Sequence, residues 1–247
     1  MKTVATRNGE TETTASGIGD KTVDTLGSQI NISIFLGLLI LTVFVMPSIG
    51  LGDRHEEWYG DTVFLILICA GTAIAWRRRG LFLFSALVGI ITLAARWMAL
   101  WRPSRAWQLC SEVATLTVIL VISWILVLHI FRRARPITAV SIQAAIAVYL
   151  LFGLGWANAY LLVMQGNPHS FHSTVGLSSS SSVEWYYYSY VTLTTVGYGE
   201  ITPLTRVARA LATGEAVTGQ LYLAVLIARL IGMEIIYSQQ KLAQNTS

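Results

Sequence analysis

The chain has 247 residues, of which 54% are hydrophobic and only 12% are charged. Soluble domains carry about 25% charged residues, so this composition excludes a soluble enzyme and a disordered protein. Two cysteines are too few for a disulfide scaffold. The net charge is only +4, and the basic residues form short clusters between apolar runs. This pattern is typical of membrane topology, so we expect a lipid bilayer as partner and no nucleic acid.

Apolar runs long enough to cross a bilayer predict six transmembrane helices. A spanning helix needs about 20 mostly apolar residues. Residues 1–28 precede the runs; they are polar and lack apolar periodicity, which predicts a disordered cytoplasmic tail. Residues 29–136 are then a four-helix transmembrane domain, and the fold class is all-α integral membrane. In chain order the runs lie at roughly 30–50, 59–76, 81–100, 111–131, 137–164 and 205–237.

Clusters of arginine predict how the chain is oriented in the membrane. One cluster, at 77–79, follows the second run, and another, at 132–135, follows the fourth. Short basic loops stay in the cytoplasm, so we expect both clusters and both termini there. The basic loop 101–110 falls on the outer side, where nearby tryptophans fit an interfacial belt. The predicted location is the plasma (inner) membrane.

A polar stretch and a short amphipathic run separate the last two apolar runs. Residues 165–184 include five consecutive serines, which predicts an extracellular loop. Residues 185–195 are too short to cross a bilayer and predict a re-entrant segment. Non-helical backbone at that depth must be covered by protein or line a water-filled cavity.

The re-entrant segment ends in the sequence TVGYG at residues 195–199, which is the general signature of a potassium selectivity filter. On this motif the chain resembles the potassium-channel family. Backbone carbonyls replace the ion's hydration shell when successive residues alternate in handedness, and glycine tolerates the positive φ that this requires. We therefore expect a filter formed by Thr195, Val196, Gly197, Tyr198 and Gly199, with K⁺ bound at the first four.

The resemblance covers residues 137–237, which would form a pore domain of outer helix, pore helix, filter and inner helix. It implies a homotetramer around one pore, passive conduction without catalysis, and no cofactor besides K⁺ as the permeant ion. Residues 238–247 would be a short cytoplasmic tail, too short for a regulatory domain. Voltage-gated relatives carry regularly spaced basic residues in their fourth helix. Here residues 113–131 contain neither Arg nor Lys, which predicts weak or no intrinsic voltage dependence.

Several residues around the filter are candidates for supporting it. Thr194 precedes the filter and Glu200 follows it, where the family commonly has Asp. Tyr187 and Tyr188 occupy the places of a tryptophan pair in many relatives, and we expect the hydroxyl of one of them to bind Glu200. Glu215 should face the protein behind the filter, where it is either protonated or accepts hydrogen bonds. Candidate partners are Thr192, Thr194, the pore-helix tyrosines and polar groups of the fifth span such as Tyr149; the alternative is a solvated glutamate.

The last run carries the candidates for gating. Gly219 matches the position of the family's hinge glycine. One face of the helix is expected to line the cavity and inner gate; it comprises Gln220, Leu223, Ala224, Ile227, Ala228, Ile231 and Ile235. The predicted function is a potassium-selective channel subunit. The alternatives are a subunit of a K⁺ uptake transporter and a poorly selective cation channel.

Overall fold

The computed structural model describes residues 30–45, 68–72, 79–101, 104–132, 139–174 and 182–245. The predicted tail 1–28 and most of the second run, 59–76, lie outside the described residues. The described chain begins with a helical segment at Ile30–Val45. The labelled elements are α3 (Arg79–Trp101), α4 (Arg105–Arg132), α5 (Ala139–Gly166), β1 (Phe171–Ser173), α6 (Ser182–Leu193), β2 (Ile201–Pro203) and α7 (Arg206–Asn245).

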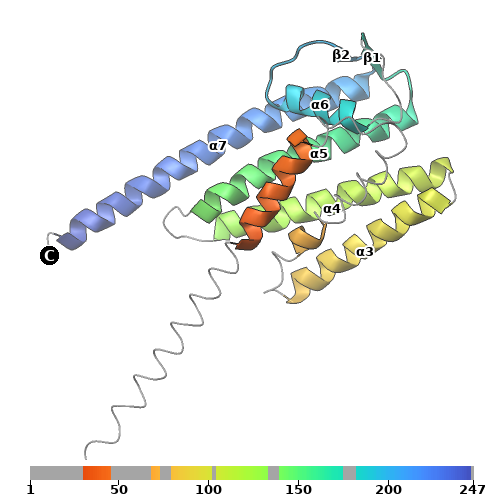
Figure 1. Cartoon of the computed structure of the whole chain (residues 1–247). Coiled ribbons are helices and arrows are strands. Elements are labelled where there is room, and N and C mark those ends of the chain that lie inside the picture. Colours follow the sequence, from red (N-terminus) through yellow and green to blue (C-terminus); the bar gives the residue numbers. More distant parts are fainter. Residues whose placement is uncertain are drawn as a thin grey trace, which may run out of the picture.

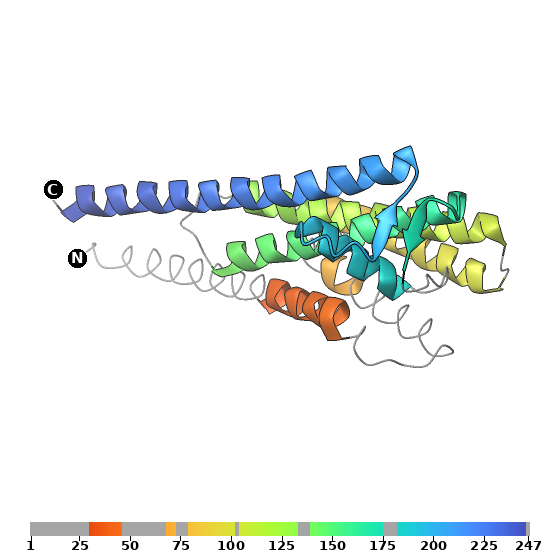
Figure 2. The ribbon, with the colours of Figure 1, turned by 90° about the horizontal axis from the view of Figure 1, so that it is seen from above.

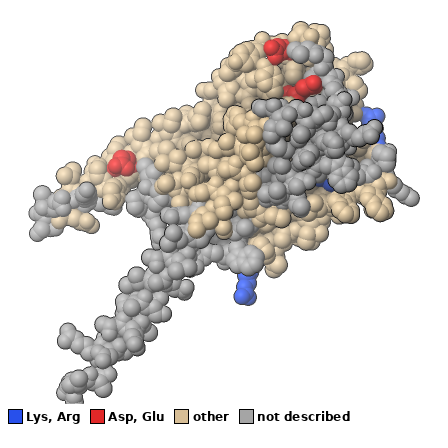
Figure 3. All heavy atoms as spheres, viewed as in Figure 1, with Lys and Arg blue, Asp and Glu red and all other residues tan. Residues whose placement is uncertain are grey.

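Within the described residues, four helices are long and apolar enough to cross a membrane: α3, α4, α5 and α7. This confirms an all-α membrane architecture, while the count of six spans stays a prediction. On the face shown in Figure 3, the few charged side chains of the described residues lie near the ends of the helices, and the described surface between them is uncharged. An uncharged belt of this kind is expected where lipid or another apolar surface covers the protein.

The helices are arranged so that α5, α6 and α7, which make up the predicted pore domain and are called the pore module below, lie at one edge of the bundle. Helix α4 packs between α3 and α5, and α6 packs against α5 and α7 (Figure 1). Helix α7 lies along one side of the molecule and extends beyond the others, as the view in Figure 2 also shows. The segment Ile30–Val45 contributes Phe35 and Leu39 to the core that α4 and α5 share.

Two features differ from the sequence-based expectation. Helix α7 continues past residue 237 to Asn245, so most of the predicted tail 238–247 is helical. The residues there include good helix formers such as Lys, Leu, Ala and Gln, and a helix that leaves the membrane need not end at its surface. The predicted loop 165–184 contains β1, which pairs antiparallel with β2 directly after the filter.

Candidate ion-conduction site

The predicted filter, residues 195–199, is anchored at the carboxyl end of α6, the predicted pore helix. The carbonyl oxygen of Val191 accepts hydrogen bonds from the backbone N–H groups of Val196 (2.9 Å) and Gly197 (3.3 Å). The hydroxyl of Thr194 donates to the carbonyl oxygen of Tyr190 at 2.6 Å. The placement of α6 therefore determines the placement of the filter.

The backbone of the filter alternates in handedness. Thr195, Gly197 and Gly199 have φ values of 60°, 58° and 87°, whereas Val196 and Tyr198 between them do not have positive φ. The expected positive φ at the two glycines is confirmed. Thr195 shares it, although a β-branched residue with positive φ is a conformational outlier. Such strain persists where the surroundings impose it and is common at functional sites.

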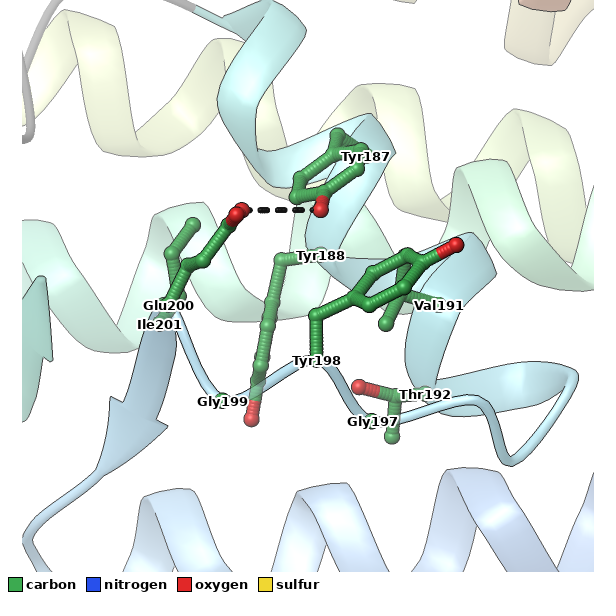
Figure 4. A pocket seen from close by; sticks show the side chains of 9 residues that line it. All are labelled: Tyr187, Tyr188, Val191, Thr192, Gly197, Tyr198, Gly199, Glu200 and Ile201. Atoms are coloured by element: carbon green, nitrogen blue, oxygen red, sulfur yellow. Dashed lines mark hydrogen bonds between the residues drawn. The ribbon is translucent and has the colours of Figure 1, made fainter. Parts of the chain in front are cut away.

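Glu200 is held by Tyr187 at the outer end of the filter. The Tyr187 hydroxyl donates to Oε2 of Glu200 at 2.8 Å (Figure 4). This hydrogen bond makes the largest contribution to raising the pKa of Tyr187 above its ordinary value, because the carboxylate stabilises the protonated phenol. The ring of Tyr198 stacks on that of Tyr187, with centroids 6.4 Å apart and planes inclined by 2°. Tyr198 thus projects back toward α6.

Removing this hydroxyl should weaken the outer end of the filter. We expect Tyr187→Phe to speed the decay of K⁺ current severalfold during sustained activation, because Glu200 loses its donor while the ring stack is kept. Single-channel recording of the purified variant measures this. Tyr186→Phe is the matched control, since it removes a neighbouring hydroxyl on the same helix. Current decay at the wild-type rate in Tyr187→Phe would contradict a role of the Tyr187–Glu200 hydrogen bond in stabilising the outer end of the filter.

Tyr188 has a different environment from its neighbour. It is buried, and its ring lies 4.9 Å from that of Tyr160 and 5.7 Å from that of Phe171. Trp185 belongs to the same aromatic cluster. Of the two candidate partners for Glu200, the structure therefore selects Tyr187, and Tyr188 fixes α6 against α5 through packing.

The short sheet holds the residue that follows the filter. His172 of β1 lies opposite Thr202 of β2, and the backbone N–H of Thr174 donates to the carbonyl oxygen of Glu200 at 3.0 Å. Strands of only three residues are too short to show an alternating apolar pattern, so these two were not predicted. The stretch after α5 is therefore tied to the outer end of the filter.

The predicted cavity face of α7 is exposed in the single chain. Gln220 stands at its filter end, where Nε2 donates to the Thr195 hydroxyl oxygen at 3.4 Å. This contact puts the side chain of Gln220 beside the inner end of the filter. The other members of the face are also exposed: Leu223, Ala224, Ile227, Ala228, Ile231 and Ile235.

Gly219 is buried and lies directly against the end of the pore helix. A Cβ atom added there would collide with the carbonyl oxygen of Leu193. Helix α7 runs through Gly219 without interruption. The structure therefore supplies a packing reason for this glycine, and its role as a hinge remains a prediction.

Glu215 is fully buried between α5, α6 and α7, so the solvated alternative is wrong. Its carboxyl oxygens contact the hydroxyl groups of Ser189 and Tyr160. Tyr160 lies in α5, which confirms the expected polar partner on the fifth span. Ser189 was not predicted, and it takes the place of Thr192 and Thr194 on α6, because the helix angle gives the direction of Glu215 but not which side chains of α6 meet it.

Polar contacts that join α4 to the pore module were not predicted. Nη2 of Arg229 in α7 donates to the carbonyl oxygen of Ile130, near the carboxyl end of α4, at 2.6 Å. A cation is favoured there by the helix dipole. Nδ2 of Asn158 in α5 donates to Oε2 of Glu112 in α4 at 2.6 Å. A Glu and an Asn inside apolar runs were the available signal, since polar groups in membranes usually have partners.

Residues 137–234 match a family model described as ion channel. Neither the search of curated proteins nor that of solved structures found a match. The matched region begins just before α5 and ends within α7, so it contains the outer helix, α6, the filter and most of the inner helix. Together with the apolar helices, this match supports an integral membrane protein with a passive ion-channel domain.

Proposed function

We propose that the chain is a subunit of a potassium-selective channel that conducts K⁺ passively. The observation that carries this proposal is the alternating backbone of TVGYG, with positive φ at Thr195, Gly197 and Gly199. Alternation of this kind can turn successive carbonyls toward one axis, where they replace the hydration shell of K⁺. Thr195, Val196, Gly197 and Tyr198 would supply the K⁺ sites, and no cofactor is needed.

The active unit that we propose is a homotetramer with the filter on the four-fold axis. One chain supplies one filter strand, and a cage of carbonyls around an ion takes four. In the single chain the whole segment Thr194–Glu200 is exposed, as expected for a surface completed by other copies. Residues 29–136 form a peripheral domain and residues 137–237 the pore domain in this proposal. Both termini face the cytoplasm, and the membrane is the plasma (inner) membrane.

Reversal potentials test the proposal directly. Purified protein in planar bilayers, with K⁺ on one side and Na⁺ on the other, should give currents that reverse close to the K⁺ equilibrium potential. Reversal near zero would identify a poorly selective cation channel. Saturable K⁺ uptake into vesicles without unitary currents would instead identify a transporter subunit. Native mass measurement of the detergent-solubilised protein should give the mass of four chains.

The channel should respond weakly to voltage. About four gating charges per subunit would contribute about 9 kcal/mol per 100 mV, at about 2.3 kcal/mol for each charge. The apolar part of α4 contains neither Arg nor Lys between its two terminal arginines. We therefore expect a shallow conductance–voltage relation over physiological potentials. A steep relation equivalent to several charges per subunit would refute this prediction.

A further inference from the structure

A hydrogen-bonded chain of four groups crosses the three helices of the pore module behind the filter. Oε2 of Glu215 in α7 contacts the hydroxyl of Tyr160 in α5, and Oε1 contacts the hydroxyl of Ser189 in α6. The same Ser189 oxygen lies 2.7 Å from the carbonyl oxygen of Gly153 in α5. Glu215 and Ser189 are completely buried. The chain of contacts thus runs from Tyr160 through Glu215 and Ser189 to Gly153.

The number of protons in this chain determines the state of Glu215. A serine hydroxyl has one proton to donate, and a backbone carbonyl has none. The contact between Ser189 and Gly153 therefore uses the serine proton. The contact between Ser189 and Oε1 then needs a proton from the carboxyl group itself. Oε2 remains an acceptor for the single proton of Tyr160, so every contact in the chain has one hydrogen.

The electrostatic surroundings also favour the protonated form of the Glu215 carboxyl group. The titratable groups that face Glu215 are tyrosines, namely Tyr149 and Tyr160 from α5 and Tyr188 and Tyr190 from α6. Among the described residues, no lysine or arginine contacts the carboxyl group, and its hydrogen-bond partners are the two hydroxyls. A buried carboxylate without a cation is strongly disfavoured relative to the neutral acid.

We propose that Glu215 keeps its proton in the folded channel and donates it to Ser189, which makes Glu215 a positioning residue for the pore helix. This inference rests on the proposed function for its effect on conduction. Ser189 lies on α6 just ahead of Val191, whose carbonyl holds the backbone of Val196 and Gly197. A shift of α6 would therefore move the filter.

Infrared spectroscopy tests the protonation state without any ion current. In purified tetramers labelled with ¹³C-glutamate, we expect a carboxylic-acid C=O band at neutral pH that shifts with the label and on exchange into D₂O. Ser189→Ala should move this band to higher frequency, because the acid loses its acceptor. Glu215→Gln should abolish it. Only carboxylate bands from glutamate at neutral pH, or a band that Ser189→Ala leaves unchanged, would overturn the proposal.

Variants at Glu215 test the positioning role. Glutamine offers an N–H to Ser189 and a C=O to Tyr160, so Glu215→Gln should keep tetramers and K⁺ current. Because the amide cannot ionise, alkaline pH should weaken the wild-type tetramer and not this variant. Glu215→Ala leaves the hydroxyls of Tyr160 and Ser189 without their partner. It should lower the association constant of the tetramer about five- to hundredfold per subunit. Equal alkaline sensitivity of the wild type and Glu215→Gln would contradict the positioning role.

These readouts separate this inference from the proposed function. An infrared band in a protein that fails to select K⁺ would refute the proposed function alone. A K⁺-selective channel without the band would refute the protonated glutamate alone.

Discussion

Gly197→Ala and Gly199→Ala should each abolish the selective K⁺ current. At φ values of 58° and 87° an L-residue with a Cβ atom is strained, at a cost of about 1–2 kcal/mol. In a tetramer the cost is about 4–8 kcal/mol for four copies. Apart from the two adjacent residues, no atom of the described part of the chain lies within 4 Å of the added Cβ at either position. The strain is therefore in the backbone and cannot be relieved by moving a neighbouring side chain.

Current and assembly must be measured on the same variant. Native mass measurement should show tetramers of both alanine variants, while bilayer recordings show no current that reverses at the K⁺ potential. Gly166→Ala is the matched control, because its Cβ also meets nothing within 4 Å and its φ is not positive. A Gly197→Ala tetramer with the wild-type reversal potential would show that the observed backbone is not required for selectivity.

The positive φ values in the filter differ in how far the sequence predicts them. Positive φ at Gly197 and Gly199 follows from the residue type and could be predicted. At Thr195 the residue type opposes positive φ, so only the expected alternation along the segment, and not the residue itself, predicts it. The alternation extends to Thr195 through its neighbours, whose backbone N–H groups bond to the end of α6. A conformation imposed by hydrogen bonds to neighbouring turns is not encoded in the propensity of the single residue.

Two further contacts depend on packing between helices and could not be predicted from the sequence. They are the choice of Tyr187 over Tyr188 as partner of Glu200, and the contact of Glu215 with Ser189. Adjacent residues of a helix point about 100° apart, so the choice between the two tyrosines depends on how α6 is rotated. The aromatic cluster around Trp185 and Phe171 fixes that rotation. For Glu215, the helix angle predicted burial correctly. Ser189 was missed because its position opposite Glu215 depends on how closely α6 and α7 approach one another.

Gly219→Ala should destabilise the tetramer and impair K⁺ conduction. The added Cβ would collide with the carbonyl oxygen of Leu193 and lie 3.1 Å from its Cδ1 atom. Leu193 is fully buried, and its carbonyl also accepts a hydrogen bond from Tyr149 at 3.4 Å. This carbonyl ends the pore helix, so it cannot move without moving the filter. Overpacking of this kind costs about 1–3 kcal/mol per site.

Gly232→Ala on the same helix separates packing from helix propensity. A Cβ at Gly232 meets no other described element within 4 Å, so this variant should gain about 1 kcal/mol of helix stability and keep its current. Thermal stability of the tetramer, reversal potential and open probability should be measured for both variants. If Gly219 is required for close packing, Gly219→Ala should lower the thermal stability of the tetramer and damage the filter. If Gly219 acts only as a hinge, Gly219→Ala should have normal stability and selectivity and a changed open probability. That result would show that α7 can move away from Leu193 at little cost.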